Sequence, residues 1–400
     1  MGEWKEYKLG DITIMKNGKK RPQNSGCYPV YGGNGIMDYS DSYNSERTIV
    51  VGRVGAYCGC VYKSEERCWV SDNAIAVYAK DNVDFQYLYY MMTSLDFHHH
   101  HIGGAQPLMT QDIIGDFIIK LPTLETQRQI ASILSSLDDK IEFNRKINAN
   151  LEAQAQALFK SWFVDFEPFK DQPFVESELG MIPEGWKVGR YDEIIDSTIS
   201  GDWGKEKPEG NYTHKVACIR GCDFQDIKNG LRGKTPERYI LEKNFQTKHF
   251  RDKDILVEIS GGTATVSTGR VCPVSQLLID KFNEDIVCTN FCRLVRPKPN
   301  YGAFLYYSWL YKYDNKVMFG YENGTSGIKN FRIKDFTALE PVVIPSEDAL
   351  MAFQIVIDKL QMKLQMNGSE SQKLASLRDA LLPRLMSGEL NVFDKPNDKS

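Results

Sequence analysis

The sequence predicts an α+β protein with pseudo-two-fold symmetry. Two similar globular domains, each rich in short strands with a few helices, are separated by two long antiparallel coiled-coil helices. Three observations lead to this prediction. The second half of the chain repeats motifs of the first, each half contains a helical segment of about 40 residues, and the apolar residues of both segments share a 4-3 spacing.

Similar motifs open and close the two repeated domains. Trp4-Lys5 opens the first domain and Trp186-Lys187 the second, and an apolar strand followed by a proline, Pro122 or Pro345, closes each. Between these points, short β-branched segments alternate with Gly, Asn and Asp, which is typical of strands joined by turns. Pro345 lies 159 positions after Trp186, whereas Pro122 lies 118 after Trp4, so the second domain is the longer one.

The two helical segments share one register, because each seam position in the second lies 223 residues after its counterpart in the first. The predicted helix–helix seam consists of Ile130, Leu134, Leu137, Ile141, Asn144, Asn148, Leu151, Leu158, Phe353, Ile357, Leu360, Leu364, Asn367, Leu374, Leu381 and Leu385. Antiparallel packing, which we favour, would bring Asn144, Asn148, Asn367 and Ser371 together, where buried polar pairs would fix the register. A parallel pair would instead match Asn144 with Asn367. Two unrelated helices, each packed on its own domain, are a further alternative.

These patterns predict the domain boundaries. They are a first domain at 1–122, a first long helix at 123–166, a linker and second domain at 167–345, a second long helix at 346–390 and a tail at 391–400. Gly368, in the middle of the second helix, costs roughly 1 kcal/mol relative to alanine. A bend or local fraying there would change the spacing that the helices set.

The composition indicates a soluble cytoplasmic protein. Hydrophobic residues make up 42% and charged residues 26% of the 400 positions, and no apolar run is long enough for a signal peptide or a membrane span. Nine cysteines, an odd number scattered through strand-like sequence, indicate reduced buried thiols. The net charge of −4 gives no overall attraction to nucleic acid, so DNA binding would require local basic patches.

No catalytic or metal site is predicted. Methyltransferase motifs do not occur, and Gly233-Lys234-Thr235 lacks the first glycine of a phosphate-binding loop. The close cysteine pairs, such as Cys58 with Cys60, do not have zinc-knuckle spacing. For His98–His101 a solvated loop is a better interpretation than a metal site.

Basic residues, amides and glycines gather in turns at corresponding regions of both domains. Lysine and arginine can position DNA phosphates, and asparagine, glutamine and arginine can contact base edges. The predicted DNA-binding residues are Lys16, Asn17, Lys19, Lys20, Arg21, Asn34, Arg53, Tyr57, Asn73, Gln106, Trp203, Lys205, Arg220, Thr263, Arg270 and Asn290.

The chain resembles the specificity subunits of type I restriction-modification systems over nearly its whole length. The most specific matching motifs are Ile119–Gln127 with Ile130–Leu134, Gly180–Trp186 and Leu381–Leu390. The resemblance implies that the domains are target recognition domains, each reading one half of a split double-stranded DNA sequence. It also implies that the helices set the gap between half-sites.

By the same resemblance, the partners are two modification subunits, which bind S-adenosylmethionine and methylate adenine, and two restriction subunits, which cleave DNA using ATP and Mg²⁺. This chain itself would be non-catalytic, bind no cofactor and have no membrane partner. Two other classes of function are alternatives: an enzyme that acts alone on nucleic acid, and a coiled-coil scaffold for proteins without sequence-specific DNA binding.

Overall fold

The computed structural model describes residues 4–103, 107–263, 265–324 and 329–392 of the chain. It divides into two compact units, Met1–Ile141 with Lys373–Ser400, and Glu142–Gln372. Each unit therefore contains part of both long helices. None of the described helices is long and apolar enough to cross a membrane.

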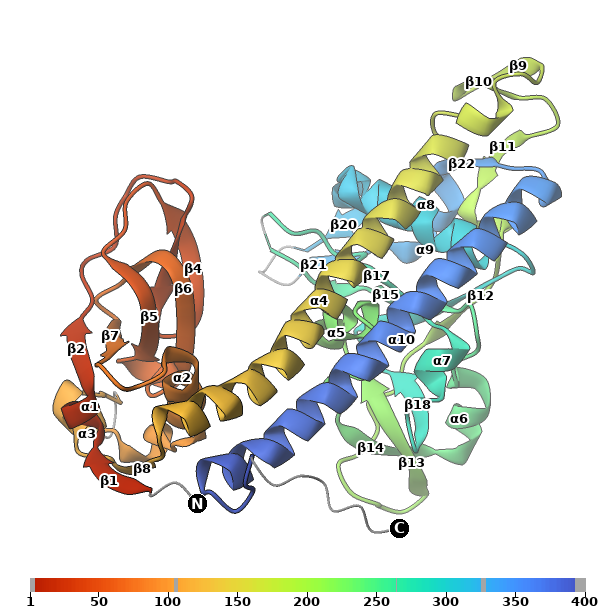
Figure 1. Cartoon of the computed structure of the whole chain (residues 1–400). Coiled ribbons are helices and arrows are strands. Elements are labelled where there is room, and N and C mark those ends of the chain that lie inside the picture. The colour runs from red at the N-terminus through yellow and green to blue at the C-terminus, as the bar shows by residue number, and fades with distance from the viewer. Residues whose placement is uncertain (1–3, 104–106, 264, 325–328, 393–400) are drawn as a thin grey trace, which may run out of the picture. The chain divides into compact units, whose positions relative to one another are not determined.

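A six-stranded sheet forms the first unit, with the strand order β2-β7-β5-β6-β3-β4 (Figure 1). Its neighbouring strands are antiparallel except for β3 and β6, which run parallel. Pairing of β1 with β8 joins the first strand of the domain to its last. The elements are β1 Lys5–Lys8, α1 Leu9–Ile12, β2 Thr13–Asn17, β3 Tyr28–Gly32, β4 Gly35–Ser40, β5 Ser45–Gly52, β6 Val61–Val70, β7 Ala74–Ala79, α2 Phe85–Ser94, α3 Gln111–Gly115 and β8 Ile118–Leu121, with 3₁₀ helices at Gly55–Tyr57 and Phe97–His100.

The core of the first unit includes one end of each long helix. Asp84 caps α2 by accepting a hydrogen bond from the Tyr87 backbone N–H at 2.9 Å, which directs the apolar face of α2 into the core. Leu134 of α4 (Leu124–Phe163) and Leu385 of α10 (Glu347–Met386) are buried in the same cluster. The start of one long helix and the end of the other thus pack in one domain.

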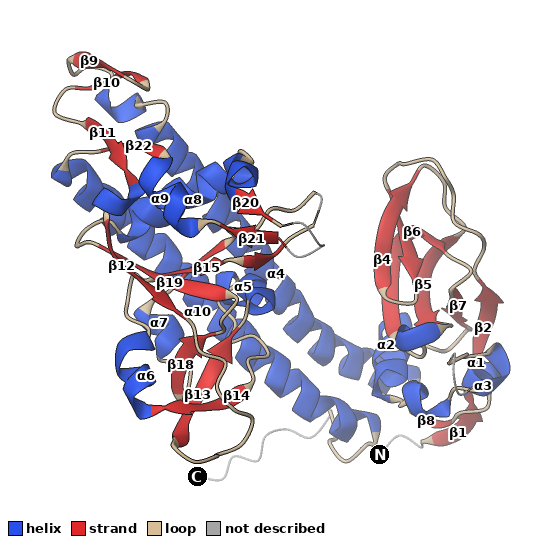
Figure 2. Ribbon diagram, turned by 180° about the vertical axis from the view of Figure 1, so that it is seen from behind, coloured by secondary structure: helices blue, strands red, loops and turns tan. Residues whose placement is uncertain are grey.

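The second unit repeats the strand order of the first. Its sheets have the orders β12-β19-β15-β17 and β14-β13-β18, with β13 and β18 parallel (Figure 2). Strands β2, β3, β4, β5 and β7 correspond to β12, β13, β14, β15 and β19, and the single strand β6 corresponds to β17 and β18 together. The elements are β9 Phe174–Ser177, β10 Gly180–Pro183, β11 Lys187–Arg190, β12 Ile195–Ser200, β13 Tyr212–Ile219, α5 Phe224–Lys228, β14 Glu237–Leu241, α6 Glu242–Lys248, β15 Ile255–Glu258, β16 Ser260–Gly261, β17 Val271–Pro273, α7 Gln276–Ile279, β18 Asp285–Cys288, β19 Cys292–Pro297, α8 Gly302–Asp314, β20 Glu322–Asn323, β21 Lys329–Phe331, α9 Ile333–Leu339 and β22 Pro341–Ile344, with 3₁₀ helices at Glu167–Phe169, Tyr191–Glu193, Gly221–Asp223 and Val317–Tyr321.

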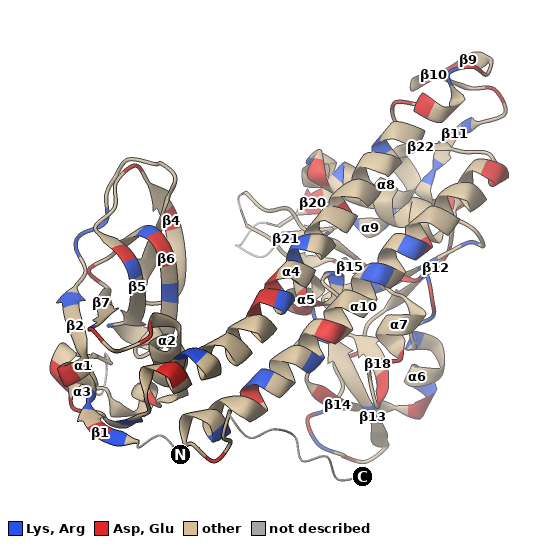
Figure 3. Ribbon diagram, in the orientation of Figure 1, with Lys and Arg blue, Asp and Glu red and all other residues tan. Residues whose placement is uncertain are grey.

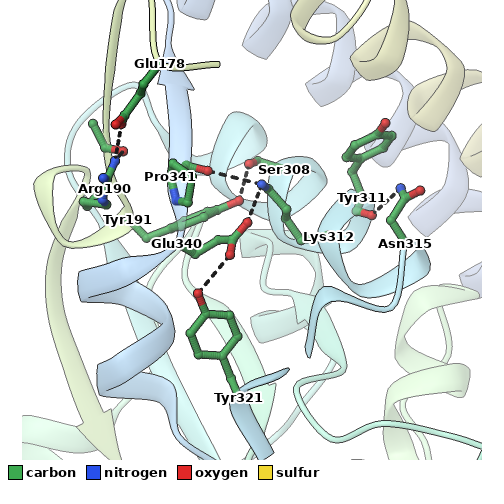
Figure 4. A network of polar contacts seen from close by, with 11 residues as sticks. Glu178, Arg190, Tyr191, Ser308, Tyr311, Lys312, Asn315, Tyr321, Glu340 and Pro341 are labelled. Atoms are coloured by element: carbon green, nitrogen blue, oxygen red, sulfur yellow. Dashed lines mark hydrogen bonds and ion pairs between the residues drawn. The ribbon is translucent and has the colours of Figure 1, made fainter. Parts of the chain in front are cut away.

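A polar network closes the core of the second unit around α8 (Figure 4). The hydroxyls of Tyr191 and Ser308 lie 2.6 Å apart, and both are buried. Glu340 receives hydrogen bonds from Lys312 at 2.5 Å and from Tyr321 at 2.9 Å. Burial, together with the Glu340 carboxylate, raises the pKa of Tyr321 to about 12, so its hydroxyl stays a donor at neutral pH.

Helices α4 and α10 are antiparallel, as predicted. Within the second unit, Asn144 donates to the Ser371 hydroxyl at 3.3 Å and Asn148 donates to the Leu364 backbone carbonyl at 3.1 Å. Asn367 donates to the side-chain Oδ1 of Asn148 at 2.9 Å. Position numbers therefore rise along one helix as they fall along the other. The predicted polar centre of the seam is confirmed.

The seam is tightest at its centre and at its ends. Of the predicted seam residues, Ile130, Leu134, Asn144, Asn148, Phe353, Ile357, Leu364, Asn367 and Leu385 are buried, and Leu137, Ile141, Leu151, Leu158, Leu360, Leu374 and Leu381 are half-buried. The ends pack into the domain cores as well as against each other. Each helix is 40 residues long, within the ranges expected from sequence. Helix α10 passes through Gly368 without interruption.

Candidate DNA interface

Turns from four parts of the sequence meet at one place in the first domain. The backbone N–H of Lys19 donates to Val70 O at 3.0 Å, that of Ser71 to Tyr31 O at 2.9 Å, and that of Arg53 to Asn73 O at 2.9 Å. Gly18 permits this convergence, because a Cβ there would lie 1.9 Å from the Ser71 carbonyl oxygen. Several predicted DNA-binding residues are thereby brought together.

The second domain repeats the same bonds with different side chains. The N–H of Asp202 donates to Cys288 O at 2.8 Å, that of Thr289 to Ile219 O at 2.9 Å, and that of Ile259 to Phe291 O at 2.8 Å. A Cβ on Gly201 would lie 1.9 Å from the Thr289 carbonyl oxygen, matching Gly18 against Ser71. We call these two equivalent groups of turns the turn clusters. They consist of residues 17–19, 31–34, 52–57 and 71–73 in the first domain, and 200–202, 219–222, 258–261 and 289–291 in the second.

The first turn cluster is more basic than the second. The exposed predicted residues in and beside it are Lys16, Asn17, Lys19, Lys20, Arg21, Asn34, Tyr57 and Asn73, and Arg53 is half-buried. Arg21 pairs with Asp38, and the Lys16 ammonium lies 5.5 Å from the Tyr78 ring centre. The exposed lysines can contact phosphate. Gln106 lies outside the described residues.

In the second domain, carboxylates already hold both predicted arginines. Arg220 donates two hydrogen bonds to Asp223, both of 3.0 Å, and Arg270 donates to Glu258 at 2.7 and 2.8 Å. Hydrogen bonds to these carboxylates raise the pKa of each guanidinium. Both arginines are half-buried and shape the turn cluster, so any contact they make with DNA would add to a structural role.

The remaining predicted residues of the second domain are exposed. Lys205 pairs with Glu209 at 3.3 Å, and the Trp203 ring lies 3.9 Å from the Arg238 guanidinium. Thr263 and Asn290 lie on exposed turns. Acidic and basic residues are mixed over both units and along both helices (Figure 3). Binding would therefore depend on local side chains more than on a broad basic surface.

Phe291 was missed by the sequence analysis. Its side chain is 65% exposed, and it occupies the position of Asn73 in the equivalent turn cluster. An apolar residue between Asn290 and Cys292 reads as part of a strand, so its exposure is evident only in the folded chain.

In the described part of the chain, no group of three or more His, Cys, Asp or Glu side chains could hold a metal ion. His98 bonds the Cys58 carbonyl at 3.0 Å, and His99 pairs with Asp96 at 2.5 Å. Gly233 has a φ of +75° and packs against Asp223, and the Gly233-Lys234-Thr235 segment belongs to the loop between α5 and β14.

Known proteins match the chain in both sequence and fold. Residues 1–153 match the family model described as type I restriction modification DNA specificity domain. The MjaIX specificity subunit of Methanocaldococcus jannaschii is 28% identical over 78% of this chain and 71% of its own length. The HindI specificity subunit of Haemophilus influenzae is 27% identical over 72% of each chain.

A solved structure supports the fold. The type I restriction-modification S subunit from M. genitalium aligns over 96% of both chains with a TM-score of 0.56 and 17% identity. Together, these matches show a type I restriction modification DNA specificity domain in residues 1–153 and a similarity to type I specificity subunits over most of the chain.

Proposed function

We propose that the chain recognises a bipartite double-stranded DNA target, with one half-site read by each turn cluster. The observation that carries this proposal is the repetition of one backbone hydrogen-bond pattern in two domains with different exposed side chains. Because the backbone hydrogen bonds are the same, each domain can place its turns in a groove of the DNA in the same way. The differing side chains, such as Asn73 against Phe291, give each a different preference for base edges.

The helices also have exposed apolar positions that repeat with the 223-residue offset. Ile133 and Val356 are each 37% exposed, and Phe143 and Met366 are 57% and 58% exposed. Exposed apolar residues at equivalent positions of both helices suit the docking of two copies of one partner. We assign these positions to the two modification subunits.

In this proposal the chain supplies no chemistry of its own. The modification subunits would bind S-adenosylmethionine and methylate adenine, and two restriction subunits would use ATP and Mg²⁺ in the cytoplasm. The specificity subunit would position both activities on one DNA site.

The test is selection from a randomised duplex pool by this chain co-expressed with its modification subunit, followed by sequencing of the retained DNA. A split motif with one fixed gap is expected. A retained pool that is still random would reject sequence recognition and favour the coiled-coil scaffold.

A further inference from the structure

The extra length of the second domain lies largely in insertions between equivalent strands. In the first domain β3 ends at Gly32 and β4 begins at Gly35, whereas β13 ends at Ile219 and β14 begins only at Glu237. A second insertion, which contains α7, divides the counterpart of β6 into β17 and β18. The first domain has neither segment.

Both insertions meet at the centre of the helix pair. The Asn229-Gly230 turn follows α5 and packs directly on α10, where a Cβ on Gly368 would lie 2.3 Å from the Gly230 carbonyl oxygen. Lys281, which follows α7, donates to the same Gly230 oxygen at 2.6 Å and to Gln365 Oε1 at 2.6 Å. One insertion thus bonds to the other and to the helix.

The polar centre of the seam forms the other side of this contact. Asn148 donates to the Asn229 carbonyl at 3.1 Å, and Gln365 donates to the Ile227 carbonyl at 3.4 Å. Asn148 is 3% exposed and Gln365 is 7% exposed. These amides therefore do more than pair the helices, because they satisfy buried carbonyls of the recognition domain.

The insertion between β13 and β14 also reaches the turn cluster. It begins beside Arg220, whose guanidinium donates to the Lys234 carbonyl at 2.8 Å, and Gly233 packs on Asp223. Phe224 and Ile227, between these points, are buried in the domain core. A displacement of the Asn229-Gly230 turn would therefore move the base of the second turn cluster.

We propose that these contacts form a clamp that fixes the second recognition domain on the helix pair and so restricts the gap length of the DNA target. The clamp consists of Asn148, Asn229, Gly230, Lys281, Gln365 and Gly368. This inference rests on the proposed bipartite function. One base pair changes the half-site separation by about 3.4 Å, so the clamp need hold the domain only to within a few ångströms to select one gap.

The main test is Gly368→Ala. Alanine is the better helix former by roughly 1 kcal/mol, so α10 itself is not weakened, whereas the added Cβ collides with the Gly230 backbone. Gly320→Ala is the matched control, because a Cβ there meets nothing within 4 Å. Lys281→Met removes the bonds that Lys281 donates to Gly230 and Gln365 without adding bulk to the helix. It thus tests the clamp independently if Gly368→Ala misfolds.

Each variant, in complex with the modification subunit, is titrated with duplexes carrying the selected gap and the gap changed by one base pair. Wild type and Gly320→Ala are expected to bind the duplex with the selected gap about tenfold or more tightly than the duplex with the changed gap. For both clamp variants this ratio of affinities is expected to be less than about threefold. The difference is of the size that one lost base contact produces. Unchanged gap preference in both clamp variants would overturn the clamp while leaving bipartite recognition intact. Absence of any gap preference in wild type would overturn both.

Discussion

Phe291 and Asn73 occupy equivalent positions but differ in what they can recognise. An amide can bond adenine in two places, whereas a phenyl ring can only contact a thymine methyl group or a base face. We expect Asn73→Ala to weaken DNA binding at the first half-site by about tenfold, since one base contact is worth about 1–3 kcal/mol. We expect Phe291→Ala to weaken DNA binding at the second half-site. Competition with duplexes altered in one half-site measures this. Equal losses on both half-sites from either variant would contradict it.

Lys281 gives the second unit a distinctive pH dependence. Burial lowers the pKa of its ammonium to about 8, below the ordinary value of 10.5, because the charged group leaves water for carbonyl partners. Between these values the unfolded chain binds more protons than the folded chain, so the free energy of unfolding rises with pH.

We therefore expect the stability of wild type relative to Lys281→Met to increase between about pH 8 and about pH 10, the window set by the two pKa values. Urea unfolding of both proteins across this window tests the expectation, since groups common to both cancel in the difference. A difference that stays constant with pH would show that Lys281 does not titrate in this range.

At the scale of elements, the exposed apolar positions of the helices allow docking to be separated from folding. Met366 is 58% exposed and Lys363, on the same helix, is also exposed. Met366→Glu is expected to weaken binding of the modification subunit at least about tenfold, because a charge would be buried at the interface. Lys363→Gln is the control. Calorimetry against the purified partner measures the loss, and an unchanged affinity would remove Met366 from the docking surface.

Elements with strong periodicity were predictable from sequence, whereas contacts between distant elements were not. The 4-3 spacing and the 223-residue offset predicted both helices and their polar centre correctly. Helix propensity gives only the cost of Gly368, because the sequence does not show that Gly230 packs against it. The sequence predicts Arg220 and Arg270 as DNA-binding residues but does not show that they pair with Asp223 and Glu258. Only the Arg220–Asp223 ion pair has a local sequence signal, because its members are three residues apart.

For the whole molecule, the uneven distribution of basic side chains predicts which domain dominates the salt dependence of DNA binding. Lys19 and Lys20 are exposed beside the first turn cluster, whereas Lys205 of the second domain pairs with Glu209. Each lysine that neutralises a phosphate adds about 0.9 to the slope of log affinity against log salt concentration. Replacing Lys19, Lys20 and Arg21 with glutamine is therefore expected to reduce the slope by about 2 to 3.

The same triple variant should keep its sequence preference, because phosphate contacts position the protein without distinguishing bases. Lys205→Gln should change the slope by less than about 1, since its charge is already partly balanced. Asn34→Ala is the complementary control, which should alter base preference in the first half-site and leave the slope unchanged. Titrations of the complex at several salt concentrations distinguish these outcomes. An unchanged slope in the triple variant would remove the first turn cluster from the DNA surface and favour a protein-binding role for the domain.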